Sequence, residues 1–168
     1  MTISMYQASV PVLTRFLNNL IAILGKGVAH AEAKKIDPDV LCGCRIIADM
    51  HPLSRQIQIA SDVAKGGAAR LAGVEPPSWA DDEKTMADLV ERLKKTIQYL
   101  ESFKPNQIDG TEERTITMKL GPNSVDFTGQ SYLLTFVLPN VFFHITTAYD
   151  ILRANGVNVG KGDFMGAV

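Results

Sequence analysis

The chain has 168 residues, of which 46% are hydrophobic and 21% are charged, and its formal net charge is −1. This length fits one domain, residues 1–168, that is large enough to bury a continuous core. Lysines and arginines are interspersed with acidic residues, which excludes the basic stripe typical of nucleic-acid-binding proteins.

No segment has the pattern of a membrane span or a secretory signal. The longest apolar stretches, Phe16–Leu24 and Tyr132–Leu138, are far shorter than the roughly 20 residues that cross a bilayer. The first residues have no basic region ahead of an apolar core. The cysteines Cys42 and Cys44 are too few for a disulfide framework, so we expect a reducing, cytoplasmic location without a membrane partner.

Three regions before residue 104 have the apolar spacing of amphipathic helices. The first spans residues 4–35. The second spans residues 52–72, has small residues on its apolar face, and is expected to end at Gly73, ahead of Pro76-Pro77. The third spans residues 82–103 and has the cleanest stripe, made of Met86, Leu89, Val90, Leu93, Ile97 and Leu100.

A hairpin and a last helix follow. The alternation in Arg114–Leu120, a turn at Gly121 and a second alternating run predict a β-hairpin. Its apolar face should lie against the helices, because a lone hairpin is marginal in water. That face consists of Ile116, Met118, Leu120, Val125 and Phe127. The last helix spans residues 130–155, and Pro139 should kink it or restart it.

Four long amphipathic helices and one small hairpin predict an all-α fold. We expect an antiparallel four-helix bundle in the up-down-up-down order, with the short β-hairpin before the last helix. A parallel α/β sheet is not expected, because the only strand signals belong to that hairpin.

Histidines are the main candidates for chemistry. His144 shares an inward helical face with Asn140, where a neutral imidazole can ligate a metal, act as a base or bond a buried carbonyl. His30 lies near the inner face of the first helix, although we favour a role at the helix end, where its charge suits the dipole.

His51 opens the second helix in line with Arg55, Gln58 and Asp62. This row is either one polar wall of a site or a solvent-facing surface, and we favour the surface. Histidines on three segments of a bundle can converge on one ion, and a catalytic zinc uses three protein ligands. However, no His-x-x-x-His or Glu-x-x-His motif is present.

The pair Cys42-Gly43-Cys44 can bind a soft metal or respond to oxidation. The alternative, which we favour, is that both thiols are buried as small apolar side chains.

The last helix carries a resemblance to a known family. The segment Phe143–Arg153, read together with Asn155-Gly156-Val157, resembles the last helix of the DinB-like (DinB/YfiT) superfamily. The wider chain is similar to a bacterial branch catalogued only as a domain of unknown function. Supporting segments are His30-Ala-Glu-Ala, Ile36-Asp-Pro38, Asp49-Met-His-Pro-Leu53, Arg55–Ala60, Ala69–Gly73, Phe127-Thr-Gly129 and Gly160–Phe164.

The resemblance implies a four-helix bundle that is often dimeric and often holds a divalent metal, zinc or nickel, on three histidines. His144 matches the second histidine of the family's usual pair in the last helix, and the first falls on Asn140. The ligand from the second helix falls on His51 or near Gln58, and His30 is an additional histidine.

Two hypotheses follow from the resemblance. The first is a metal-dependent hydrolase or thiol transferase in which His144, His51 and His30 ligate the ion and Asn140 orients water or substrate. The second is a non-enzymatic module, either a small-molecule binder or a homodimer that has lost the metal, because Asn140 stands where the family has a histidine.

Overall fold

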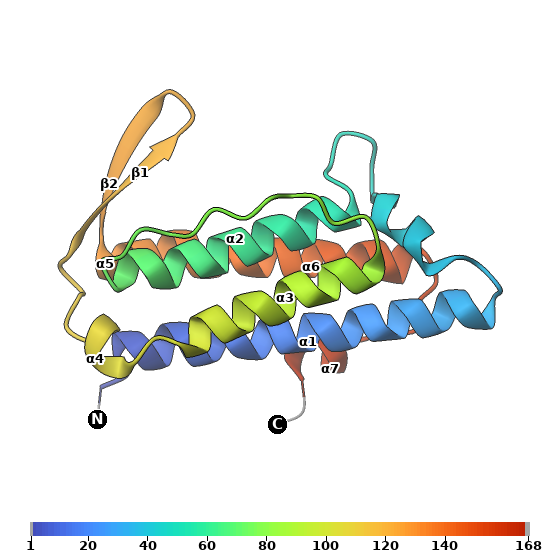
Figure 1. Ribbon diagram of the computed structural model, residues 1–168, viewed down its shortest axis with the longest axis horizontal. Coiled ribbons are helices and arrows are strands. Elements are labelled where there is room, and N and C mark those ends of the chain that lie inside the picture. Colours follow the sequence, from blue (N-terminus) through green and yellow to red (C-terminus); the bar gives the residue numbers. More distant parts are fainter. Residues whose placement is uncertain (1, 167–168) are drawn as a thin grey trace.

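The structure is a computed structural model that describes residues 2–166; the side chain of Leu120, which we assigned to the apolar face of the hairpin, lies outside the described part. The chain is mostly helical, with one small antiparallel sheet (Figure 1). The elements are α1 (Met5–Ala33), η1 (Pro38–Gly43), α2 (Leu53–Leu71), α3 (Met86–Glu101), α4 (Pro105–Ile108), β1 (Thr115–Leu120), β2 (Asn123–Thr128), α5 (Gly129–Ser131), η2 (Tyr132–Val137), α6 (Leu138–Ala154) and α7 (Lys161–Met165).

The long helices α1, α2, α3 and α6 pack side by side around a common apolar core. Helix α1 packs against α3 and α6, and α2 packs against the same two helices from the opposite side. Five of the six residues that we assigned to the stripe of the third helix are buried, and the sixth, Val90, is half-buried. The periodicity therefore identified the core faces correctly.

The order of helix directions differs from the up-down-up-down expectation. Asp62 of α2 pairs with Arg92 of α3, and three residues further along each helix Lys65 and Lys95 contact the same Trp79 ring. Positions therefore advance together, which means that α2 and α3 run in the same direction. Since α1 and α6 also run parallel to each other, as Figure 1 shows, the order is up-down-down-up.

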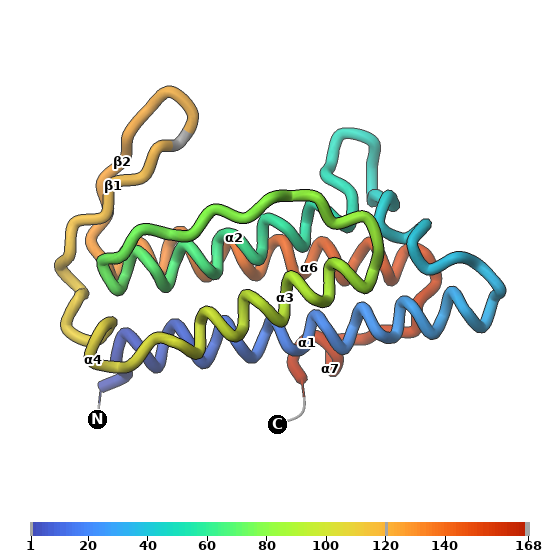
Figure 2. The backbone as a smooth tube through the Cα atoms, viewed as in Figure 1, coloured from blue at the N-terminus to red at the C-terminus, as the bar shows by residue number. Residues whose placement is uncertain are grey.

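The reversal depends on the segment between α2 and α3, residues 74–84, which we call the strap. It leaves α2 at Gly73, which has a φ of +73°, and returns along the length of the helix pair before α3 begins (Figure 2). Pro76 and Pro77 keep it from continuing the helix. An extended chain covers about twice the distance per residue of a helix, so a short strap can span a long helix.

At Pro139 we expected a kink or a restart of the last helix, and α6 indeed begins at Leu138 with this proline in its first turn. The six residues before α6, Tyr132–Val137, form a π-helical segment that joins it directly, and Leu138 donates its N–H to the carbonyl of Leu133 five residues back. The wider turn accommodates the proline ring and its missing donor without ending the helix.

The β-hairpin is confirmed, with Thr115 paired to Thr128 and Met118 paired to Val125. Only its base packs on the bundle: Ile116 is buried, and the Phe127 ring contacts Tyr132 and Phe136. The distal part projects away from the helices in Figure 1. The expectation that the whole apolar face lies against the bundle is therefore only partly met.

Two helices, Met5–Ala33 and Gly129–Ala154, are long and apolar enough to cross a membrane by length and composition alone. In this fold they pack against each other and contribute core residues such as Leu13, Leu17 and Ile145. The core helices of a soluble globular protein have the same composition, so this finding is weak evidence for a membrane span.

Candidate functional site

His144 of α6 meets Gln56 of α2 at the seam between these two helices. The Nδ1 atom of His144 lies 2.6 Å from the side-chain oxygen of Gln56, and the Gln56 amide nitrogen donates to the backbone carbonyl of His51 over 3.0 Å. The second bond fixes the amide so that its oxygen faces the imidazole. Because that oxygen can only accept, Nδ1 carries the proton and Nε2 keeps its lone pair.

The environment holds His144 neutral. Burial first, and then the nearby charges of His51 and Arg55, lower the pKa of His144 from 6.5 to about 4. Burial and like charge both disfavour the imidazolium form. At neutral pH His144 is therefore an uncharged base in a fixed tautomer. Gln56 itself is 2% exposed and sits between apolar positions of α2.

The other candidate residues do not join this pair in one group. His51 is exposed and precedes α2, while Asn140 is half-buried one turn before His144. His30 lies in the last turn of α1, close to Gly156, as expected for a histidine at a helix end. Within residues 2–166, no three His, Cys, Asp or Glu side chains are arranged to hold a metal ion.

The side chain that hydrogen-bonds His144, Gln56, is an amide and not an imidazole. Gln56 presents an amide oxygen where the second helix meets His144, and Asn140 carries another amide. Neutral amide oxygens suit hard cations better than zinc or nickel, which prefer imidazole and thiolate ligands. The arrangement fits hydrogen bonding to an organic molecule.

Gln58 belongs to a different cluster. It is buried, accepts from Arg55 over 3.3 Å and donates to Glu83 of the strap over 2.9 Å. Within the polar row that starts at His51, Arg55 and Gln58 thus contact the strap, while His51 itself is exposed.

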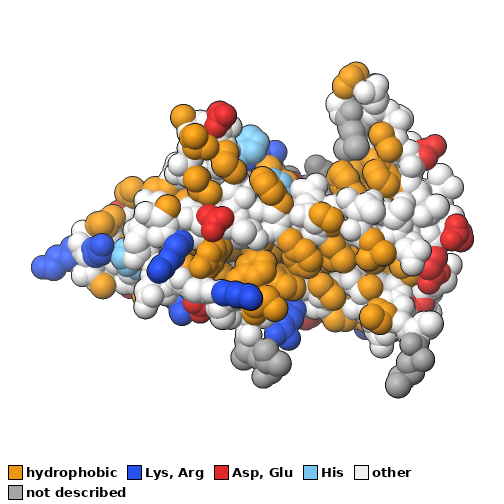
Figure 3. All heavy atoms as spheres, turned by 180° about the vertical axis from the view of Figure 1, so that it is seen from behind, with side chains coloured by type: hydrophobic (Ala, Val, Ile, Leu, Met, Phe, Trp, Pro, Cys, Tyr) orange, Lys and Arg blue, Asp and Glu red, His pale blue; other side chains and the backbone are white. Residues whose placement is uncertain are grey.

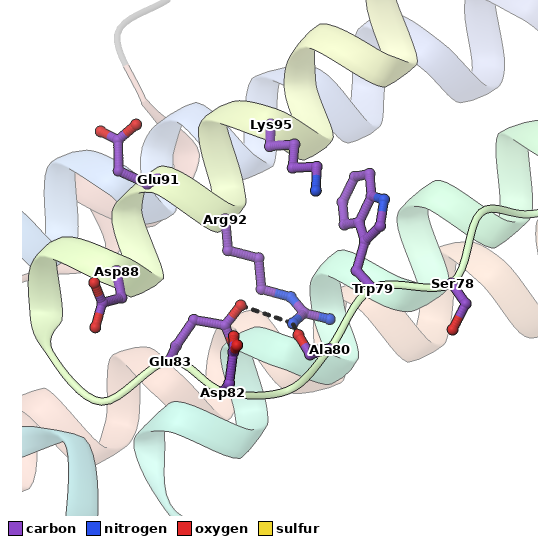
Figure 4. Close-up of a pocket in the computed structure, with 9 residues that line it drawn as sticks. All are labelled: Ser78, Trp79, Ala80, Asp82, Glu83, Asp88, Glu91, Arg92 and Lys95. Carbon is purple, nitrogen blue, oxygen red and sulfur yellow. Dashed lines mark hydrogen bonds and ion pairs between the residues drawn. The ribbon is translucent and has the colours of Figure 1, made fainter.

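The centre of this second cluster is Arg92, which sequence reasoning missed. Its side chain is 2% exposed and reaches three carboxylates, Asp62, Asp81 and Glu83, at 2.8–2.9 Å. The signal was its position: Arg92 follows Leu89 by three residues and therefore lies on the inner face of α3. Figure 4 shows the guanidinium enclosed between the helix and the strap.

The two cysteines are free thiols. Cys42 is buried, as favoured, and burial together with the Asp39 carboxylate raises its pKa to about 11. Cys44 is half-buried, with its Sγ 3.6 Å from the carbonyl of Val40. A thiol with so high a pKa is a poor nucleophile and a poor soft-metal ligand.

Comparison with known proteins agrees with the observed fold. A family model described as a domain of unknown function, DUF1993, matches residues 5–165. A solved structure described as a DinB family member from Shewanella denitrificans is 42% identical, with a TM-score of 0.87, and covers 97% of this chain and 92% of that chain. No curated protein matches. The chain belongs to the DUF1993 family, and its fold is DinB-like.

Proposed function

We propose that this DinB-like protein binds a small organic molecule at the α2–α6 seam, with His144 Nε2 as the hydrogen-bond acceptor. The observation that carries the proposal is the 2.6 Å bond from Nδ1 to Gln56, which leaves Nε2 with its lone pair. A neutral imidazole in a fixed tautomer accepts a hydrogen bond from a hydroxyl or a thiol.

A thiol-bearing ligand fits the surrounding charges. Arg55 lies close enough to His144 to lower its pKa, and a guanidinium stabilises a thiolate or carboxylate on the ligand. In this arrangement the ligand thiol donates a hydrogen bond to Nε2, because the low pKa of His144 keeps the imidazole neutral.

Nuclear magnetic resonance of the imidazole Cε1–H signals tests this proposal. Addition of glutathione should shift the His144 signal saturably, and His144→Ala should abolish binding. His30→Ala removes a histidine outside the site and should leave the affinity unchanged. Binding that survives His144→Ala would show that the site lies elsewhere.

A metal-dependent hydrolase or thiol transferase is the second candidate. It is favoured by one observation: metal-bound histidines use one ring nitrogen as ligand and anchor the other through a hydrogen bond, as His144 is anchored by Gln56. Tag-free protein should then contain zinc or nickel by elemental analysis and gain thermal stability from the added ion. Metal-free protein with an unchanged melting temperature would exclude this candidate.

We further propose that the protein is a cytoplasmic homodimer. Residues 129–149 contain no Asp, Glu, Lys or Arg, yet Leu134 and Phe143 in this range are 50% and 56% exposed. Apolar side chains gather across the face seen in Figure 3. A large uncharged patch on a surface helix is typical of a protein–protein interface. The free thiols agree with a reducing compartment.

Light scattering coupled to size exclusion measures the oligomeric state. Phe143→Lys should convert the dimer to a monomer, while Ile46→Lys, which changes an exposed apolar residue outside residues 129–149, should not. A wild-type protein that elutes as a monomer at micromolar concentration would contradict the dimer.

A further inference from the structure

The strap is attached to the helices almost entirely through side chains. Among the described residues, no backbone–backbone hydrogen bond involves residues 75–83. The attachments are the backbone carbonyl of Ala80, which accepts from Arg92, the carboxylates of Asp81 and Glu83, and the Trp79 ring. Segments held in this way open locally at a lower free energy than helices.

The groove beneath the strap is rich in cationic groups. Arg92 is fully enclosed, Lys65 has a side chain that is 5% exposed, and Arg55 lies at the edge. Among the described helix residues, the carboxylate that bonds these cations is Asp62, which contacts both Lys65 and Arg92. The α3 carboxylates Asp88 and Glu91 line the adjacent cavity but bond Thr85 and Lys94 instead. Three positive charges thus face one negative charge from the helices.

The strap supplies the two missing negative charges. Asp81 contacts Arg92 and Arg55, and Glu83 contacts Arg92 at 2.8 Å while its second oxygen accepts from Gln58 at 2.9 Å. Removal of the strap would therefore leave two uncompensated cations in a groove of low dielectric. Such a groove attracts a dianion with the same two carboxylate-like ends.

A cavity gives a ligand access to this groove. It has a volume of about 620 Å³. Its charged lining residues are Arg92 and Lys95, the strap carboxylates Asp82 and Glu83, and the α3 carboxylates Asp88 and Glu91. When the strap lifts, its two carboxylates leave this lining with it. Figure 4 shows Trp79 and Lys95 on one side of Arg92 and Glu83 on the other. The Trp79 ring lies 4.3 Å from Lys65 Nζ and 4.4 Å from Lys95 Nζ, so it screens two cations that would otherwise face the cavity together.

We propose that the groove under the strap is a binding site for a small dianion, a dicarboxylate or a phosphate. In the closed state described here, Asp81 and Glu83 occupy the site as an internal competitor. A dianion displaces these carboxylates from Arg92 and Arg55, and the strap lifts from α2 and α3. The dianion site lies between α2 and α3, whereas the His144–Gln56 pair lies between α2 and α6. The two sites share Arg55, which contacts Asp81 and whose charge also reaches His144.

Calorimetric titration with succinate and with inorganic phosphate tests the proposal at constant ionic strength. The variant Asp81→Asn/Glu83→Gln removes both competing carboxylates. It should bind at least one probe about tenfold more tightly than wild type, because the closed state is no longer stabilised by these ion pairs. The control Glu75→Gln/Glu101→Gln removes the same charge from exposed residues that do not line the cavity, and should leave the affinity unchanged.

Adding Arg55→Gln to the opened variant should weaken binding again, because it removes one of the three cations. In wild-type protein, saturating succinate or phosphate should speed hydrogen exchange in residues 75–84. The proposal is overturned if both double variants bind equally, if neither probe binds, or if exchange in the strap is unchanged or slower. Preference for one probe would identify the dicarboxylate or the phosphate as the ligand class.

Discussion

Replacement of Arg92 by methionine should destabilise the protein far more than replacement of a neighbouring surface lysine. The guanidinium is the shared partner of three carboxylates, and its side chain is 2% exposed. Methionine fills a similar volume but leaves Glu83, which is 11% exposed, without its cation. Breaking a buried ion pair from one side costs about 3–5 kcal/mol.

The expected loss is smaller than that full range. Asp62 and Asp81 are 38% and 36% exposed, so water replaces much of what they lose. Ser61 also keeps its 2.8 Å bond to Thr96. We therefore expect a loss of about 2–4 kcal/mol, with Glu83 as the main contributor. For a chain of this size, such a loss lowers Tm by roughly 5–15 °C.

Urea denaturation followed by circular dichroism gives the free energy of unfolding. The matched control is Lys94→Met on the same helix, because Lys94 pairs only with the exposed Glu91 and should contribute no more than about 0.5 kcal/mol. Adding Glu83→Gln to Arg92→Met should recover at least about 1 kcal/mol, since no buried carboxylate is then left unpaired. An Arg92→Met variant as stable as Lys94→Met would refute the reasoning.

Three further outcomes can be measured. The pKa of His144 falls from 6.5 to about 4 on folding, so between these pH values the unfolded state binds more protons than the folded state. The free energy of unfolding should therefore decrease as the pH drops from 6.5 to about 4, and it should decrease more steeply in wild type than in His144→Asn. Gly67→Ala should lower the free energy of unfolding by about 1–3 kcal/mol, because the new Cβ would lie 2.7 Å from the Val137 side chain of η2. Gly25→Ala places its Cβ in open space and should raise the free energy of unfolding by up to about 1 kcal/mol. Iodoacetamide at pH 8 should modify Cys44 before Cys42, whose pKa is about 11.

Each of these outcomes has a direct contradiction. Equal pH slopes for wild type and His144→Asn would mean that His144 titrates normally in the native state. Equal effects of the two glycine substitutions would show that the contact between α2 and η2 yields without cost. Faster labelling of Cys42, seen by mass spectrometry of peptides, would show that the loop around η1 opens readily.

The core faces could be predicted because helical periodicity reports burial directly. Residues such as Leu89, Leu93 and Leu100 are buried as their spacing indicates. The relative direction of α3 could not be predicted, because Pro76-Pro77 signals only that a helix ends. A tight turn and a long return segment both satisfy that signal, and the choice depends on contacts of Trp79 and Arg92 that are distant in sequence.

The site was predictable in part. His144 was identified from its inward-facing position, but its partner was missed, because a row with glutamines at positions 56 and 58 does not reveal which amide faces α6. Gln56 lies three residues after Leu53 and four before Ala60, which are both fully buried. This spacing places Gln56 on the buried face of α2 and could have identified it as the partner of His144. The Arg92 cluster was missed because the inner face of α3 was defined by its apolar residues alone, and the charged residue on that face was not considered.

The π-helical turn at Tyr132–Val137 has a consequence for the length of the sequence. Tyr132 and Leu133 at its start, and Val141 and Ile145 after it, all reach the core. A π-turn amounts to one extra residue inserted into an α-helix, and each helical residue turns the chain by about 100°. Deleting one residue here would rotate Tyr132 and the hairpin before it by about 100° around the helix axis. We therefore expect any one-residue difference in the length of the last helix among family members to fall in this segment.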